Sequence, residues 1–281
     1  MEEKVLMEQL RAALLGQHEV RRTFRQKTAF IAWVRAYAEG LGVRVTVEES
    51  GQMIRSRNIV FGDADKARTI ITAHYDTCTW MPTGAVTTPG CWPLLVLTEL
   101  AQLVLLLPLL AIMFFGVSNP HTANDNTSGV LLVLLLMARL KDRPDVAFVL
   151  FDNEETGLWG SQAFTKAHPQ AVRRFLLNLD CVGDGDTLLY TGMPRGLRMP
   201  QAMRLQKAME SVAPQYGMRT ATGAFPKWLY PSDQMLFPRG TAFAALKGKK
   251  LLYLNRIHTP RDMVLEERNI SCLAEIIEQS I

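Results

Sequence analysis

Residues 128–152, SGVLLVLLLMARLKDRPDVAFVLFD, hold the pattern from which the fold is best predicted. The first part of this stretch is apolar on every side and stops at Pro144, which is typical of a helix buried against a sheet. The second part, residues 146–152, is a short continuous apolar run that indicates a buried central strand. A buried helix that leads into a buried strand is characteristic of α/β proteins.

The same alternation continues on both sides of this stretch. Apolar residues recur at three- and four-residue steps from residue 24 to residue 42, so an amphipathic helix is expected there. Short apolar or β-branched runs predict further strands at 43–49, 57–63, 68–74, 175–180, 187–192, 241–248 and 251–255. Further helices are expected at about 161–173, 200–212 and 266–281. We therefore predict one α/β domain over residues 1–281, with a mixed, mostly parallel central sheet flanked by helices on both faces.

Composition and charge limit the classes of function. The chain has 281 residues, 48% of them apolar and 21% charged, so it can bury a full core. Its net charge of +4 is scattered without a basic run, so nucleic acid is not expected as a partner. The four cysteines lack CxxC spacing, and Cys78 and Cys181 are expected to be small core residues. The first residues carry acids where a signal peptide needs a basic start, so we expect a cytoplasmic protein without a signal peptide.

Acidic and imidazole side chains gather at the carboxyl ends of three expected strands. In chain order these residues are His74 and Asp76, Glu154 and Glu155, and Asp180. Ligands of open α/β sheets bind at that edge, so the side chains are expected to converge although they are distant in sequence.

Two further residues could face the same crevice. Asp125 stands at the start of the buried helix, and His258 follows the last expected strand within a loop. Oxygen and imidazole ligands without thiolates suit Zn²⁺, Mn²⁺ or Co²⁺. A two-metal site needs a carboxylate that bridges ions roughly 3.5 to 4 Å apart, and Asp125 is the natural candidate for the bridge.

The adjacent acids Glu154 and Glu155 suggest a division of roles. They point different ways from a strand end, so one can bind metal while its neighbour accepts a proton from the attacking water. Asp76 is placed to hydrogen-bond the second ring nitrogen of His74 and so fix its tautomer.

Five segments resemble motifs of the M28 metallopeptidases, a family that includes bacterial leucyl-type aminopeptidases. They occur in the family's order between about residues 56 and 265, and they are HYDT (74–77), NDNTSG (124–129), DNEETGLWGS (152–161), NLDCVGDGD (178–186) and RIHTPRDM (256–263). Each segment contains a residue of the metal-binding type. The resemblance implies a zinc-exopeptidase fold of the phosphorylase/hydrolase-like kind.

The resemblance also implies an activity and a ligand set. The chain would be a zinc-dependent aminopeptidase that hydrolyses N-terminal residues from peptides, with Glu154 as the general base. Two Zn²⁺ ions, for which Co²⁺ or Mn²⁺ could substitute, would be bound by His74, Asp125 and Asp180 on one side and by Asp125, Glu155 and His258 on the other. Two alternatives stand beside this interpretation: a glutaminyl-cyclase-like acyltransferase, which shares the fold but uses one zinc ion, and a non-catalytic membrane scaffold.

The sequence departs from the family in two places. In PSDQMLF (231–237), Gln234 stands where the family usually has a histidine. Asp233 and Gln234 are therefore candidate substrate-binding residues, and Tyr230 is a candidate oxyanion donor. The second departure is an apolar insertion, residues 91–117, between the first ligand and the bridging one.

The insertion is long enough to cross a hydrocarbon core of about 30 Å as one helix. A simple span is not expected, because His74 and Asp125 must meet in one aqueous site. We expect either a helical hairpin or re-entrant segment at a membrane surface, or a cap helix buried in the domain or in a homodimer interface.

Overall fold

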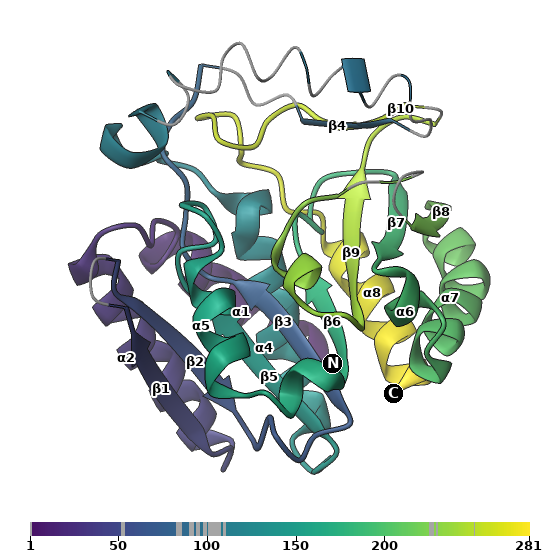
Figure 1. Cartoon of the computed structure of the whole chain (residues 1–281), viewed down its shortest axis with the longest axis horizontal. Helices are drawn as coiled ribbons and strands as arrows, with labels where there is room; N and C mark the ends of the chain where they lie inside the picture. The colour runs from purple at the N-terminus through teal and green to yellow at the C-terminus, as the bar shows by residue number, and fades with distance from the viewer. Residues whose placement is uncertain are drawn as a thin grey trace.

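The computed structural model describes residues 2–51, 54–82, 86–89, 93, 96–97, 100, 108, 111–224, 228, 230–249 and 251–281. Figure 1 shows a twisted sheet with helices around it and a short ribbon of two strands above one edge of the sheet. The strands are β1 (Val45–Ser50), β2 (Ser56–Phe61), β3 (Thr69–His74), β4 (Val86–Pro89), β5 (Val146–Phe151), β6 (Phe175–Leu179), β7 (Thr187–Gly192), β8 (Arg219–Ala224), β9 (Gly240–Leu246) and β10 (Leu251–Leu254).

The centre of the sheet is parallel. The strand order is β1-β2-β5-β3-β6-β9-β7-β8, and β3 pairs in parallel with β5 and β6, as does β6 with β9. These strands are buried along their whole length, as continuous apolar runs predict for strands covered on both faces. The predicted mixed sheet is confirmed, and the carboxyl ends of its four central strands lie at one edge.

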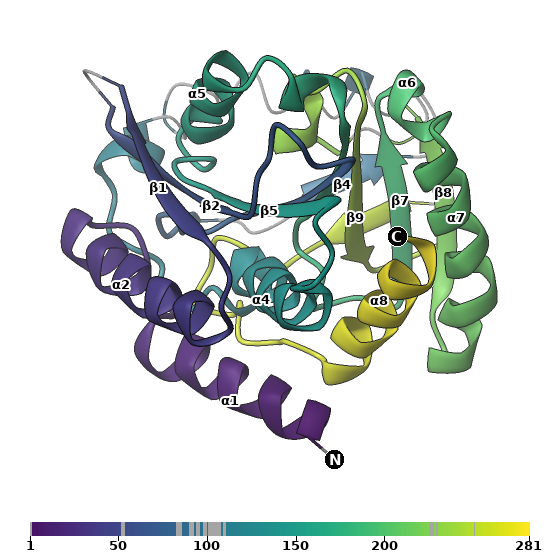
Figure 2. The ribbon, with the colours of Figure 1, turned by 90° about the horizontal axis from the view of Figure 1, so that it is seen from below.

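Helices cover both faces of this sheet (Figure 2). They are α1 (Glu2–Gln17), α2 (Phe24–Gly40), α4 (Gly129–Leu140), α5 (Trp159–Ala167), α6 (Pro194–Leu197), α7 (Pro200–Val212) and α8 (Glu267–Ser280), with short turns η1 (Ala123–Ser128), η2 (Ala171–Arg173), η3 (Ala213–Tyr216) and η4 (Asp233–Leu236). The helix α4 packs on β3, β5 and β6 from one side, whereas α5 and η4 lie on the other. Neighbouring residues of one strand, such as Ile70 and Ile71, therefore enter different cores.

The start of α2 fixes the path of the N-terminal segment. The Thr23 hydroxyl accepts the backbone N–H of Gln26 at 3.3 Å, and the Gln26 side chain accepts the backbone N–H of Thr23 at 2.8 Å. This reciprocal capping box satisfies two backbone donors. Arg21 and Arg22, directly before the cap, are thereby held in place.

Two strands of the structure were not predicted. The strand β8 lies at the edge of the sheet and is half exposed, so its sequence carries no apolar run. The strand β4 pairs with β10 in an antiparallel ribbon outside the main sheet, above the carboxyl edge in Figure 1.

Most of the predicted apolar insertion, residues 91–117, lies outside the described residues. The two predictions for it, a helical hairpin or re-entrant segment and a buried cap helix, therefore stay predictions. Residues 111–115 are helical, and Phe115 and Val117 are strongly exposed. Among the residues described, no helix combines the length and the apolar character of a membrane span.

Candidate metal centre

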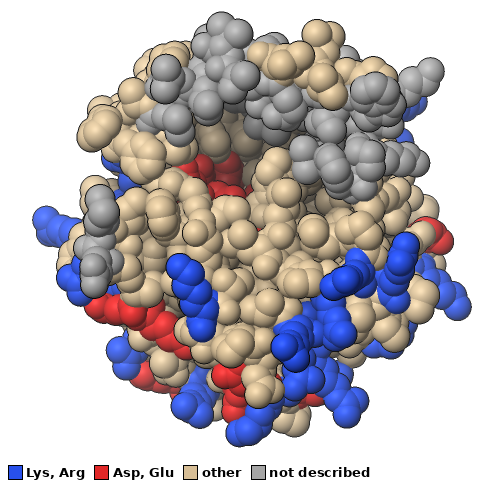
Figure 3. Space-filling view, viewed as in Figure 1, with Lys and Arg blue, Asp and Glu red and all other residues tan. Residues whose placement is uncertain are grey.

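Three parallel strands bring acidic and imidazole groups to one edge of the sheet. The strand β3 ends at His74, in register with Phe151 at the end of β5. The chain after β5 carries Glu154 and Glu155, and Asp180 directly follows β6. These strands are neighbours in the sheet, so the side chains at their ends can meet. In Figure 3 acidic groups are visible at the floor of a hollow near the upper edge.

Asp125 lies between two imidazole rings. It belongs to η1, a buried turn that leads into α4, and its own backbone angles are not helical. Its Oδ1 lies 3.3 Å from Nε2 of His74, and its Oδ2 lies 2.9 Å from Nε2 of His258. One carboxylate therefore faces both histidines, as a bridging ligand does in two-metal sites.

The two histidines define two halves of the cluster, which share Asp125. In the inner half-site, Nε2 of His74 lies 3.7 Å from Oδ1 of Asp180, and these side chains are 1% and 7% exposed. In the outer half-site, Nε2 of His258 lies 3.3 Å from Oε2 of Glu155, and these side chains are 27% and 9% exposed. The structure thus brings together all five residues that were predicted as ligands.

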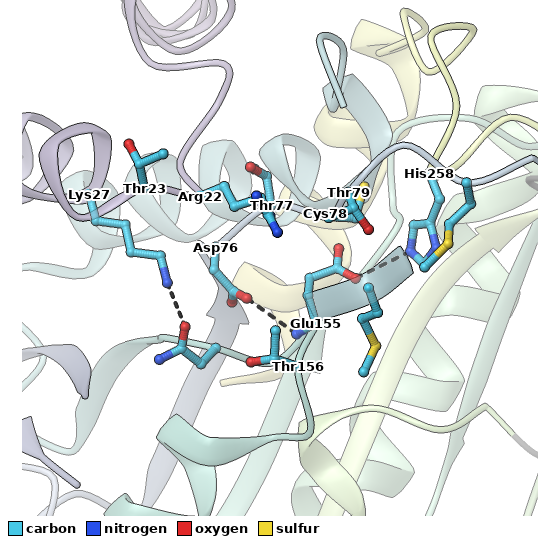
Figure 4. Close-up of a pocket in the computed structure, with 13 residues that line it drawn as sticks. Arg22, Thr23, Lys27, Asp76, Thr77, Cys78, Thr79, Glu155, Thr156 and His258 are labelled. Carbon is cyan, nitrogen blue, oxygen red and sulfur yellow. Dashed lines mark hydrogen bonds and ion pairs between the residues drawn. The ribbon is translucent and has the colours of Figure 1, made fainter. Parts of the chain in front are cut away.

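Asp76 supports the loop that carries the two glutamates. Its carboxylate accepts the backbone N–H of Glu154 at 3.0 Å and that of Glu155 at 3.2 Å, the second of which is drawn in Figure 4. The carboxylate lies 3.6 Å from Nδ1 of His74, while the backbone carbonyl of Asp76 lies closer to that nitrogen, at 3.1 Å. Asp76 therefore links the first histidine to both glutamates.

Arg21 is a residue of the site that sequence reasoning missed. Its side chain is fully buried, and its guanidinium donates to the Tyr75 carbonyl at 2.5 Å and to the Thr127 hydroxyl at 3.0 Å. It thereby ties the segment after His74 to the turn that carries Asp125. Burial lowers the pKa of Arg21 to about 10, which leaves it charged at neutral pH.

Asp262 is a second residue that was missed. Its two buried carboxylate oxygens accept the backbone N–H of Asn124 at 2.9 Å and that of Asp125 at 3.0 Å. Burial, with added repulsion from Asp125, raises the pKa of Asp262 to about 7. A signal was present in the sequence, because Asp262 stands four residues after His258 in the RIHTPRDM segment.

A buried ion pair anchors the start of the glutamate loop, and it was missed as well. The Lys27 ammonium donates to Asp152 at 2.5 Å and to the side chain of Asn153 at 2.6 Å. The second carboxylate oxygen of Asp152 accepts the backbone N–H of Arg57 at 2.9 Å. The chain directly before Glu154 is therefore fixed to α2 and to β2.

Burial and like charges shift the acids of the cluster. Burial, together with neighbouring carboxylates, raises the pKa of Glu154 well above its usual value and that of Glu155 to about 7. Burial opposes the charging of His74 and His258, but the carboxylates around them raise the pKa of both rings. Against its own burial, Asp125 has a lowered pKa because both rings bond it. The cluster concentrates negative charge in a buried volume, which a cation would neutralise.

The donor set fits a divalent metal ion. The ligand atoms of the inner half-site all lie within 4.8 Å of one another. Cys78, expected as a core residue, is buried, and its sulfur forms a second such group with Glu155 and His258. Oε1 of Glu155 is buried and has no hydrogen-bond partner among the described residues, a defect that a bound ion would remove.

Of the three candidate substrate residues, Tyr230 faces the cluster. It lines a cavity of about 140 Å³ whose wall includes Glu154 and all five candidate ligands on one side and Leu254 and Ile257 among its apolar residues. We call this cavity the apolar chamber. Asp233 is buried and accepts a hydrogen bond from a serine hydroxyl at 2.5 Å. The Gln234 amide donates to the Tyr230 carbonyl at 2.6 Å. Asp233 and Gln234 lie outside the lining of this chamber and hold the chain behind it.

A second cavity, of about 220 Å³, adjoins the outer half-site (Figure 4). It shares Glu155 and His258 with the apolar chamber. Arg22, Thr23 and Lys27, from the N-terminal segment, contribute to its wall. We call this cavity the polar chamber.

The chain matches the family model described as Peptidase family M28 over residues 58–274. This span contains both half-sites and Glu154. None of the curated proteins matches the chain.

Solved structures with the same fold include two kinds of enzyme. Porphyromonas gingivalis glutaminyl cyclase is 17% identical with a TM-score of 0.65, and the match covers 99% of this chain and 96% of that chain. A leucine aminopeptidase precursor from Bacteroides thetaiotaomicron is 15% identical with a TM-score of 0.63, covering 99% of this chain and 95% of that chain. Fimbriiglobus ruber glutaminyl cyclase is 18% identical with a TM-score of 0.64, covering 98% and 92%. At these identities the likeness shows the fold alone.

Proposed function

The chain belongs to peptidase family M28, and from this premise we propose that it is a metal-dependent aminopeptidase that hydrolyses the N-terminal residue from peptides. One observation carries the proposal. The Asp125 carboxylate faces His74 and His258 at 3.3 and 2.9 Å, and a further carboxylate stands beside each ring. This arrangement supports two zinc ions, replaceable by Co²⁺ or Mn²⁺, one in each half-site.

When bound, the ions would polarise the scissile carbonyl and acidify water near neutral pH. The protein's own contribution is proton transfer. Glu154 takes a proton from the attacking water and gives it to the leaving amine. Burial raises the pKa of the Glu154 carboxyl well above its usual value, which makes its carboxylate a stronger base than that of an exposed glutamate. Asp76 positions Glu154 through the backbone bond of 3.0 Å.

The proposal is tested by metal content and activity of the wild type beside Glu154→Gln. We expect the wild type to hold about two zinc ions per chain and to release the N-terminal residue from an amino-acid anilide until a chelator is added. Glu154→Gln should keep its metal and lose about 10²- to 10⁴-fold in kcat. Glu8→Gln, at an exposed glutamate of α1, is the matched control. A wild type that neither binds metal nor cleaves would leave a non-catalytic scaffold.

A glutaminyl-cyclase-like acyltransferase is the second candidate, supported by the fold shared with two cyclases. A peptide with an N-terminal glutamine separates the two activities. An aminopeptidase releases free glutamine, whereas a cyclase keeps every residue and expels ammonia. Mass spectrometry of the product distinguishes these outcomes directly.

A further inference from the structure

The polar chamber beside the outer half-site suggests which peptides this enzyme takes. Resting on the proposed aminopeptidase activity, we propose that the polar chamber binds the C-terminal residue of a dipeptide and that Arg22 binds its α-carboxylate. The N-terminal residue would occupy the apolar chamber. The chain would then act as a dipeptidase.

The two chambers are each large enough for one residue of a substrate. They measure about 140 and 220 Å³. A cavity of about 150 Å³ holds a molecule the size of benzene, so each chamber has room for about one residue. Both linings include Glu155 and His258, so the bond between two residues that fill them would lie at the outer half-site.

Two hydroxyl groups in the wall of the polar chamber are closed to a ligand. The hydroxyl oxygens of Thr79 and Thr156 are fully buried, and neither has a hydrogen-bond partner among the described residues. Recognition of a polar substrate in this chamber therefore falls to the charged side chains of the wall.

Arg22 supplies a positive charge in this wall. In Figure 4 its side chain projects from the N-terminal segment toward Glu155. Its guanidinium donates to the Phe114 carbonyl at 3.2 Å, and none of the described acidic side chains forms an ion pair with it. Lys27, the other cation of the lining, is already paired with Asp152. Arg22 therefore keeps donors for a carboxylate, which a guanidinium binds through two parallel hydrogen bonds.

The test compares leucyl-alanine with leucyl-alaninamide, which lacks only the terminal charge. We expect the metal-loaded wild type to prefer the free dipeptide. Arg22→Gln should lose roughly ten- to a hundredfold in kcat/KM for leucyl-alanine, mainly through KM, with little change for the amide. Arg22→Lys should recover part of the loss, because it keeps the charge without the planar fork. Arg25→Gln, at an exposed arginine of α2 outside the lining, is the matched control.

Two outcomes overturn the inference and leave the aminopeptidase in place: equal kcat/KM for both substrates in the wild type, or an equal loss for both in Arg22→Gln. If neither substrate is cleaved, the proposed function fails instead. Calorimetric binding of the same two compounds to metal-loaded Glu154→Gln then decides, because binding needs no turnover. Tighter binding of leucyl-alanine than of its amide supports the inference if this difference disappears in the double variant that also carries Arg22→Gln. Equal affinities for the two compounds overturn it.

Discussion

The two half-sites around Asp125 differ in how the fold holds them. The inner ligands, His74 and Asp180, stand at the ends of neighbouring parallel strands and are 1% and 7% exposed. The outer ligands, Glu155 and His258, come from loops and are 9% and 27% exposed. His258 also has a left-handed backbone, with φ of 58°, which residues other than glycine adopt only rarely.

This difference teaches where the site is rigid and where it can open. The inner ligands stand at the ends of central strands, whereas the outer ligands stand on loops, which open at a lower free energy than core strands. We therefore expect tighter binding and slower exchange of metal in the inner half-site. Ligands of both half-sites line the apolar chamber, whereas the polar chamber is lined by the outer ligands alone.

Removing the histidines one at a time is the strongest test of this difference between the two half-sites. We expect His74→Ala and His258→Ala both to lose activity to background, because a two-metal reaction needs both ions. His258→Ala should keep the inner ion through desalting, whereas His74→Ala should hold its remaining ion weakly. Plasma mass spectrometry measures both, with His121→Ala as the control. A tightly held ion in His74→Ala and none in His258→Ala would reverse the assignment.

Substitutions in the Lys27–Asp152 ion pair test whether this anchor of the glutamate loop stabilises the outer half-site. Lys27→Met leaves Asp152 buried without its cation, which should lower the free energy of unfolding by about 3–5 kcal/mol. Asp152→Asn added to Lys27→Met should restore part of this, since no unpaired charge remains. Urea denaturation gives the stability, and chelator titration should show the outer ion released first. A loss below about 1 kcal/mol, the range of surface pairs, would argue against this anchor.

Strand ends were the most predictable part of the site. The apolar runs before His74, Glu154 and Asp180 mark where strands end, and parallel strands end at one edge. Asp125 was expected to bridge two ions and His258 to face the same crevice, but only the resemblance to a family assigned His258 to an ion. The inner half-site was therefore predictable from pattern alone to a greater extent than the outer one.

Buried charges away from strand ends were not predictable. Arg21 and Lys27 have the same local pattern as exposed basic residues. Their burial is created by partners more than fifty residues away, namely Tyr75 and Thr127 for Arg21 and Asp152 for Lys27. The edge strand β8 was missed for a related reason, because a half-exposed strand needs no apolar run.

Substitution of Asp233 tests how a buried carboxyl behind the inner half-site affects stability. Burial raises its pKa from the ordinary value of 3.8 to about 7. The folded state therefore holds a proton that the unfolded state releases, and this stabilisation is full below pH 3.8 and is lost as the pH rises to about 7. Metal-free Asp233→Asn should be more stable than the wild type at about pH 8 by at most about 4 kcal/mol, with the gap closing toward about pH 4. Urea denaturation in chelator measures this. A gap that does not change with pH would contradict the prediction. The control is Asp63→Asn, at a half-buried aspartate paired with Lys66 at 2.8 Å, which should show no gain at high pH.

Substitution of Asp262 is expected to change metal affinity least among these variants. It should weaken both ions equally, because Asp262 holds Asp125, which both half-sites share. In Asp262→Asn one acceptor oxygen becomes a donor, so the bond to the backbone N–H of Asn124 or of Asp125 is lost. Groups that orient metal ligands typically contribute 10- to 100-fold to metal affinity, and with one bond kept we expect roughly tenfold, or about 1.4 kcal/mol. Competition with a chelator, followed separately for the two ions, measures the loss. Equal weakening would mean that the half-sites differ through their own strands and loops. Weakening of the outer ion alone would mean that His74 and Asp180 bind the inner ion even when Asp125 is not held in place. The difference in affinity between the two half-sites would then originate in Asp125.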